Sequence, residues 1–122
     1  MSQTLTAVPE RTSQVVTFEL RDQGGVLIAD ANLLTLTLTL SDLRTNQILN
    51  ARLKTNIKNA NGWTVATGAV SGILTDLDNV MLDLALAEER HLATVEWTYL
   101  SAGNTFRGAE EILVPVSRHA AR

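Results

Sequence analysis

His91 is the residue whose type and surroundings could do chemistry. It follows an arginine and two glutamates, Glu88 and Glu89, and an imidazole beside carboxylates can bind a metal ion or act as an acid or base. Either role needs further groups at the same point, and the only other histidine is His119 near the C-terminal end. One histidine with two carboxylates would hold a metal weakly. We therefore expect His91 to hydrogen-bond the backbone where a loop enters the strand predicted over 92–100.

Three aspartates, Asp76, Asp78 and Asp83, suggest a calcium-binding loop at first sight. Their spacing lacks the glycine at the sixth loop position and the glutamate at the twelfth that an EF-hand needs. A helix N-cap and solvated carboxylates explain them better. The chain also has no nucleophile elbow, phosphate-binding loop or Ser-His-Asp pattern. We therefore expect a protein that is not an enzyme and has no catalytic residue, metal or cofactor.

Trp63, Trp97 and Tyr99 could form a stacking platform for a sugar or a base. On strands with alternating polarity, such side chains more often belong to the core. A carbohydrate- or surface-binding β-sandwich that uses these three residues is the alternative function.

The composition favours one compact domain made in the cytosol. The chain has 122 residues, 45% of them hydrophobic, which suits a single core. It contains no cysteine, which excludes disulfides and thiolate sites. We see no secretion signal and no apolar stretch long enough to cross a bilayer. The net charge of −3 argues against general binding to DNA.

Charges of opposite sign are separated along the middle of the chain. The segment 43–75 contains four bases and no acid, and the segment 76–89 contains five acids and no base. The bases are Arg44, Arg52, Lys54 and Lys58, and the acids are Asp76, Asp78, Asp83, Glu88 and Glu89. These segments could be two solvated faces or complementary patches that join subunits head to tail. A nucleic-acid site is the weaker interpretation, because no aromatic residue is interleaved with the bases.

Apolar and polar residues alternate with a period of two over most of the chain, which predicts β-strands. The clearest case is 33–40, where Leu34, Leu36, Leu38 and Leu40 alternate with threonines and should share one face. Further strands are predicted over 15–21, 52–58, 63–66, 70–74, 94–100 and 106–116. Turn sequences lie at 22–25, 44–47, 61–62 and 101–104. Many short strands with little helix predict an all-β sandwich or barrel.

The segment 74–86 is ambiguous, and we favour one helical turn near 76–80 followed by a short strand, with a short helix running to Ala87 as the alternative. Residues 1–13 lack alternation and residues 117–122 are small and polar. The predicted organisation is an N-terminal arm over 1–13, a sandwich over 14–116 and a C-terminal tail over 117–122. Pro115 should lie at a sheet edge or a bulge.

Several short motifs follow one another in order between Asp42 and Tyr99. They are Ile48, Asn50 and Arg52; Asn59-Ala60-Asn61-Gly62; Leu74, Thr75 and Asp78; Glu89 and His91; and Glu96-Trp97-Thr98-Tyr99. This order resembles a family of small virion structural proteins of tailed bacteriophages. The resemblance spans roughly the last two-thirds of the chain and is looser before Asp42. It departs from the family pattern in Trp63-Thr64 directly after Asn-Gly and in the leucine-rich segment 80–86.

The resemblance implies an immunoglobulin-like antiparallel β-sandwich of about seven to nine strands. It also implies a non-enzymatic capsid decoration, neck or tail-associated protein, found in the virion after synthesis in the host cytoplasm. Its partners would be the major capsid protein or neck and tail proteins, and copies of itself, with no specific nucleic acid and no membrane. The candidate partner-binding residues are Arg11, Thr35, Thr37, Thr39, Arg52, Lys54 and Lys58.

Overall fold

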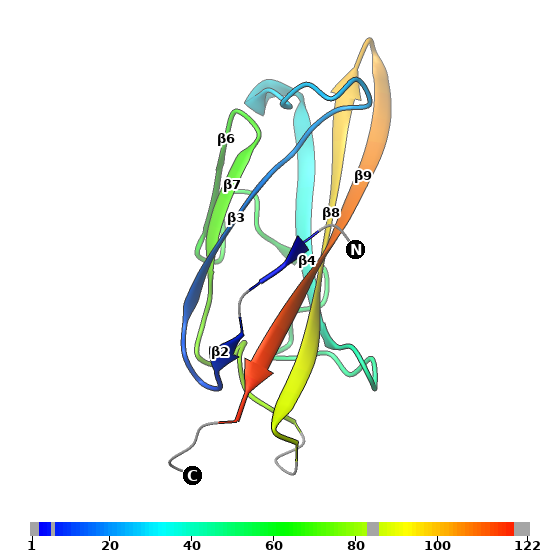
Figure 1. Cartoon of the computed structure of the whole chain (residues 1–122). Coiled ribbons are helices and arrows are strands. Elements are labelled where there is room, and N and C mark those ends of the chain that lie inside the picture. The colour runs from blue at the N-terminus through cyan, green and yellow to red at the C-terminus, as the bar shows by residue number, and fades with distance from the viewer. Residues whose placement is uncertain (1–2, 6, 83–85, 119–122) are drawn as a thin grey trace.

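The computed structural model of the chain describes residues 3–5, 7–82 and 86–118. In this part, nine strands form two sheets that pack face to face (Figure 1). They are β1 (Gln3–Thr4), β2 (Val8–Pro9), β3 (Gln14–Glu19), β4 (Leu33–Asp42), β5 (Thr55–Asn56), β6 (Trp63–Ala66), β7 (Ala69–Leu74), β8 (Glu88–Ser101) and β9 (Asn104–Ser117). A single 3-10 turn, η1 (Asp30–Asn32), is the one helical element among these residues.

The strand order is that of an immunoglobulin-like sandwich. The smaller sheet has the order β3-β7-β6, and the larger one has the order β1-β9-β8-β4-β5, with β2 also beside β9. In immunoglobulin terms, β3, β7 and β6 take the places of strands B, E and D, and β4, β8 and β9 those of C, F and G. The predicted fold class is therefore confirmed.

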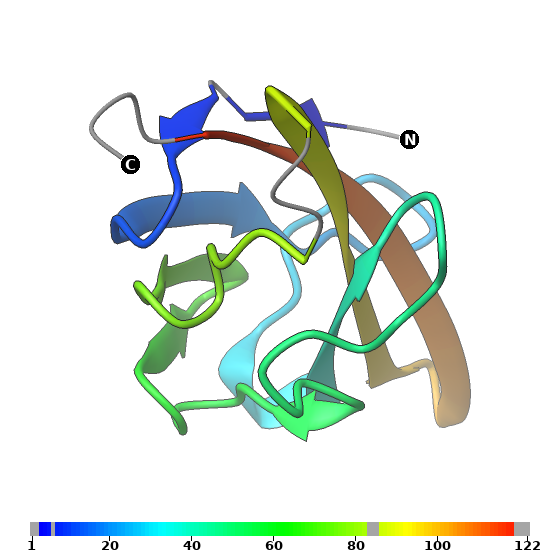
Figure 2. The ribbon, with the colours of Figure 1, turned by 90° about the horizontal axis from the view of Figure 1, so that it is seen from below.

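The core lies between the two sheets, which form separate layers when seen from below (Figure 2). Alternate residues of each strand point into it, as the period of two requires. From β4 come Leu36, Leu38 and Leu40, all at most 1% exposed. Full burial of each leucine contributes about 1.5–3 kcal/mol to folding. Ile112 and Val114 of β9 are equally buried, as predicted.

The start of β4 departs from the expected alternation. Four leucines were predicted on one face, but Leu34 is 42% exposed and Leu33 is buried instead. The register between β4 and β8 shifts between Leu33 and Thr35. Such a β-bulge reverses the side-chain alternation, so only three of the four leucines reach the core.

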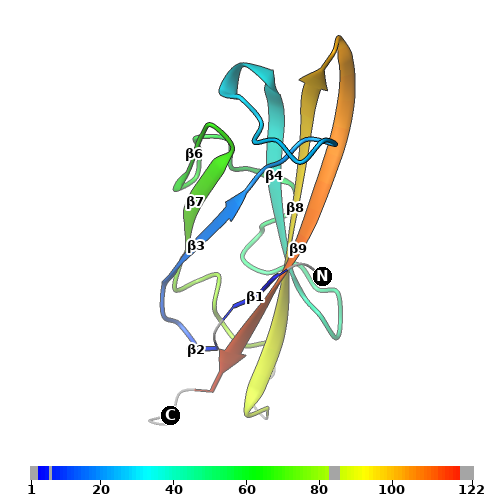
Figure 3. The ribbon, with the colours of Figure 1, turned by 45° about the horizontal axis from the view of Figure 1, so that its top comes forward.

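The N-terminal segment is not the separate arm that the sequence predicts. β1 and β2 run parallel to β9, with Gln3 opposite Ile112 and Val8 opposite Val116. Figure 3 shows both short strands beside the red half of β9. The N–H of Glu10, which is also buried, donates to the carbonyl of Ser117. Residues 3–10, apart from the undescribed residue 6, therefore cover part of a sheet edge.

Two other segments are less regular than predicted. The strand expected over 52–58 is reduced to β5, and the remainder is loop in which Leu53 is exposed and Ile57 is buried. The helical turn expected near 76–80 is a hydrogen-bonded turn without helix, in which Asp78 donates its N–H to the carbonyl of Thr75. The alternatives for 80–87 fall partly on residues 83–85, outside the described residues.

The hairpin of β8 and β9 forms where the sequence predicts it. Its turn residues Ala102 and Gly103 both have positive φ angles, 52° and 80°, the combination of a type I′ turn. Pro115 is in β9, between the stretches that pair with β1 and β2. It is opposite Arg90 in the continuous β8–β9 ladder, and on the side away from β8 it has no strand partner among the described residues, which agrees with the predicted position at a sheet edge.

Candidate functional site

The predicted threonine face exists on the outer side of the larger sheet. The hydroxyl oxygens of Thr35 and Thr98 lie 2.6 Å apart, within hydrogen-bonding distance, and Thr37 donates to the carbonyl of Glu96 at 3.5 Å. Thr39 accepts the backbone N–H of Lys54 at 3.0 Å. Thr35 is exposed, and Thr37 and Thr39 are half-buried. These threonines are thus held in place by β8 and by the loop after β4.

The predicted basic residues do not form one surface. Arg52 pairs with Asp78 inside the protein, and the Nζ of Lys58 donates to the carbonyl of Leu33 at 2.7 Å. Lys54 is exposed in the loop before β5. Arg11 is exposed in the turn after β2. Lys54 is joined to the threonine face through its backbone N–H, which bonds Thr39.

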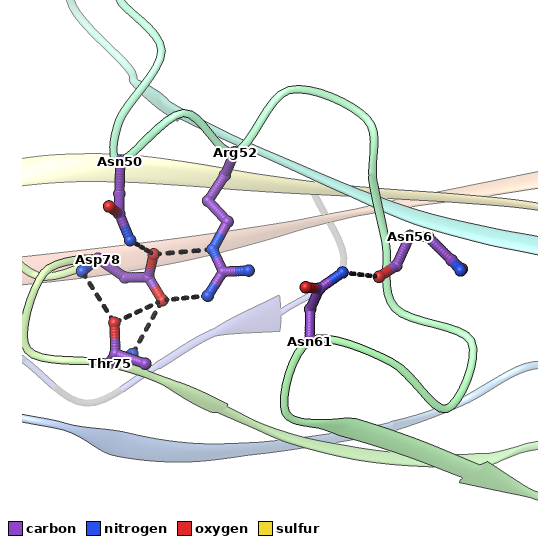
Figure 4. A network of polar contacts seen from close by, with 6 residues as sticks. All are labelled: Asn50, Arg52, Asn56, Asn61, Thr75 and Asp78. Atoms are coloured by element: carbon purple, nitrogen blue, oxygen red, sulfur yellow. Dashed lines mark hydrogen bonds and ion pairs between the residues drawn. The ribbon is translucent and has the colours of Figure 1, made fainter.

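A network of hydrogen bonds around Asp78 joins the basic segment 43–75 to the acidic segment 76–89 of the same chain (Figure 4). The carboxylate accepts hydrogen bonds from Arg52 Nε at 3.0 Å, Arg52 Nη2 at 3.2 Å and Asn50 Nδ2 at 2.8 Å. It also accepts the N–H of Thr75 at 2.9 Å and its hydroxyl at 3.2 Å. The loop carrying Asn50 and Arg52 is thereby fixed to the turn after β7.

The electrostatics of this network favour the ionised carboxylate. Burial alone would raise the pKa of Asp78. Hydrogen bonds from Arg52, Asn50 and the Thr75 backbone, with the charge of Arg52, outweigh that effect and hold the pKa of Asp78 below its ordinary value of 3.8. Because all these donors already serve Asp78, the network is a structural link.

The aromatic platform is absent, because its three members are in the core. Trp63, Trp97 and Tyr99 are 3%, 7% and 4% exposed. Each tryptophan lies across a glycine of the neighbouring strand, Trp63 over Gly72 and Trp97 over Gly108. A Cβ atom at either glycine would overlap the indole. These side chains stabilise each sheet from inside and cannot stack on an outside ligand.

Three titratable side chains meet at the end of the sandwich where β4 stops and β8 starts. Asp42, Glu89 and His91 are each at most 2% exposed. One possible ligand atom from each lies within 4.8 Å of the other two. Asp42 is opposite His91 in the β4–β8 register, and Glu89 precedes His91 by two residues on the same face of β8. We call these three residues the acid–histidine cluster.

Hydrogen bonds hold both carboxylates of the cluster. Asp42 Oδ2 accepts the N–H of Thr45 at 3.1 Å and its hydroxyl at 2.7 Å. Glu89 accepts the N–H of Leu82 through both oxygens, at 2.9 and 3.1 Å. His91 Nε2 lies 2.6 Å from Glu89 Oε1, whereas its Nδ1 is buried without a partner among the described residues. The backbone hydrogen bond predicted for His91 is therefore not the contact that the structure shows.

A pocket reaches the cluster from outside. It has a volume of 270 Å³ and includes Asp42 and Glu89 in its lining. The other residues of the lining are Leu43, Arg44, Leu86, Glu88 and Arg90. The cluster is thus buried, with Asp42 and Glu89 at the wall of a pocket.

Sequence reasoning singled out His91 and Glu89 but not Asp42. A signal was present, because Asp42 continues the alternation of Leu36, Leu38 and Leu40 and must face the core with them. Of the five acids between 76 and 89, Asp78 and Glu89 are buried and Asp83 lies outside the described residues. The acidic segment is therefore not one solvated face.

Comparison of the chain with family models, with curated proteins and with solved structures yields no match. Within the described ranges, no helix has the length and apolar character needed to cross a membrane.

Proposed function

We propose that this chain is a non-enzymatic structural protein of a tailed-bacteriophage particle. It docks on the capsid shell as a decoration, or at the head–tail neck, and reinforces or joins the particle. The order of the motifs from Ile48 to Tyr99 carries the proposal, because it resembles that of such proteins. The immunoglobulin-like sandwich supports it, since the resembled family has this fold.

The threonine face is the surface that we propose for docking. Its members on β4 and β8 are β-branched and partly fixed by hydrogen bonds, such as that between Thr35 and Thr98. Side chains that are already ordered lose little conformational entropy when a partner covers them. The ion pair between Glu96 and Arg107, at 2.7 Å, borders this face and adds polar specificity.

The free edge of β9 is the second proposed contact. β1 and β2 pair with residues 112–113 and 116–117, so residues 104–111 have no described strand on the side away from β8. An exposed edge offers backbone donors and acceptors to an extended segment of another protein. A neighbouring capsid, neck or tail protein could add a strand there.

Quantitative mass spectrometry of purified particles, scaled to the major capsid protein, tests the proposal. Near-equal amounts indicate decoration of the shell, and on the order of a dozen copies indicate a ring at the neck or tail, in keeping with closed cyclic symmetry. If the chain is absent from purified particles, the proposal fails.

Variants on opposite faces test the docking surface. Thr37→Asp places a charge on the threonine face, and Thr64→Asp places one on the exposed outer side of β6 as a matched control. We expect both to fold, with only Thr37→Asp losing binding to particles that lack the protein. Equal binding by the two variants would exclude the threonine face.

A further inference from the structure

We propose that the acid–histidine cluster binds one divalent transition-metal ion, with Zn²⁺ the best fit, through Asp42, Glu89 and His91. The three residues offer one imidazole nitrogen and at least two carboxylate oxygens within 4.8 Å of one another. Zn²⁺ accepts such mixed ligands at about 2.0–2.2 Å. An imidazole ligand favours a transition metal over Ca²⁺ or Mg²⁺, which prefer oxygen alone.

The histidine supplies the independent observation. His91 is fully buried, one ring nitrogen contacts Glu89, and the other has no hydrogen-bond partner in the described structure. A buried polar atom without a partner is unfavourable in an ordinary core. The Nδ1 of His91 is therefore left for a partner that the described part of the protein does not itself supply.

The surroundings orient the carboxylates as the outer hydrogen bonds of a metal site do. Thr45 binds one oxygen of Asp42, and the Leu82 N–H binds Glu89. Asp42 forms no ion pair within the described residues, although it is buried. A divalent cation would offset the cost of burying this carboxylate beside Glu89.

The pocket beside the cluster supplies access and an open position. It is lined by Asp42 and Glu89 and could admit the ion and a water molecule. Three protein ligands with one position left for water is a common arrangement for Zn²⁺. The ion would join the end of β4 to the start of β8, and through Leu82 to the segment before β8. In a chain without cysteine, the ion would cross-link these segments as a disulfide does in other proteins. The Zn²⁺ site does not depend on whether the protein belongs to a virion.

Titration of the chelator-treated full chain with ZnCl₂ tests the proposal. Calorimetry should give one Zn²⁺ per chain. At a free Zn²⁺ concentration 100 times the Kd, the apparent equilibrium constant for unfolding should fall about 100-fold. MgCl₂ at the same concentration should change neither quantity. If Zn²⁺ does not bind saturably, the proposal is wrong.

Two cluster variants and two control variants assign the site. Glu89→Gln and Asp42→Asn preserve shape but remove a charged ligand, and each should weaken Zn²⁺ binding at least tenfold. Glu111→Gln, an exposed glutamate outside the pocket lining, should bind as the wild type does, as should His119→Gln. Unchanged affinity in both cluster variants, or lost binding in His119→Gln, would overturn the assignment.

A measurement on the wild type covers the case in which the cluster variants do not fold. The ring nitrogens of His91 can be followed by NMR during addition of one equivalent of Zn²⁺. We expect a change in the His91 resonances that saturates at one equivalent. Resonances of His91 that stay unchanged while Zn²⁺ binds elsewhere would also disprove the site.

Discussion

Asp42 and Asp78 are both buried aspartates held by a threonine three residues away, yet their remaining neighbours differ in charge. Thr45 follows Asp42 and donates both its N–H and its hydroxyl to one carboxylate oxygen. Thr75 precedes Asp78 and makes the same two contacts. Beyond these, Asp78 faces Arg52 and Asn50, whereas Asp42 faces Glu89 and His91.

The difference shows that the local sequence fixes the carboxylate, and the tertiary neighbours decide what it can do. Around Asp78 the donors are matched to the acceptor, and the pKa of this carboxyl is held low. Around Asp42 lie a second carboxylate, that of Glu89, and the ring of His91, whose Nδ1 has no hydrogen-bond partner among the described residues. A matched buried acid is a structural link, and an unmatched one retains capacity to bind a ligand.

The largest expected effect comes from Asp78→Ala. Arg52 is 13% exposed in its side chain, so the substitution leaves a mostly buried guanidinium without its partner. Breaking one side of a buried pair costs about 3–5 kcal/mol. The free energy of unfolding, measured by urea denaturation of the wild type and the variant, checks this value.

Asp76→Ala is the matched control, two residues away and exposed. Its free energy of unfolding should stay within about 0.5 kcal/mol of the wild type. If the two variants lose similar stability, the network around Asp78 is not the link described above.

A smaller effect is expected on acidification. The pKa of Asp78 is lower in the folded state than its ordinary value of 3.8. The ionised carboxylate of Asp78 therefore stabilises the folded state above about pH 3.8. This contribution to the free energy of unfolding is lost as the pH falls through the lowered pKa of Asp78 in the folded state. Neutral Asp78 still accepts hydrogen bonds, so the loss should be smaller than in Asp78→Ala.

The stability difference between the wild type and Asp78→Asn isolates this contribution. Urea denaturation at pH 7, 5, 4 and 3 should give a constant difference from pH 7 to 5 and a smaller one at pH 3. A difference that grows on acidification would contradict the sign of the pKa shift.

The strands that could be predicted from the sequence are those whose pairing leaves a local pattern. β6, β7 and the β8–β9 hairpin show alternation and turn residues, which depend only on neighbours in the chain. β1 and β2 leave no such pattern, since two residues are too few to alternate, and their pairing depends on β9 more than 100 positions away. The bulge before Thr35 is equally invisible, because a register shift belongs to two strands at once.

The candidate site follows the same division. Glu89 and His91 share a strand face, so their proximity is predictable from spacing alone. The meeting of Asp42 with His91 depends on the β4–β8 register, which alternation does not give. Likewise, Arg52 and Asp78 were assigned to separate charged segments, and only the fold brings them together.

The smallest expected loss of stability comes from replacing Thr45 or Thr75 with valine. Valine removes the side-chain hydroxyl and keeps the backbone N–H. Thr45→Val should cost about 1 kcal/mol, because the hydroxyl, at 2.7 Å, is one of two hydrogen-bond donors that Asp42 has in the described structure. Thr75→Val should cost less, because Asp78 keeps the donors of Arg52, Asn50 and the Thr75 backbone. Thr64→Val on the outer side of β6 serves as the control, and urea denaturation measures all three. A larger loss for Thr75→Val than for Thr45→Val would mean that the donors around Asp78 do not substitute for one another, and the contrast between a matched and an unmatched carboxylate would fail.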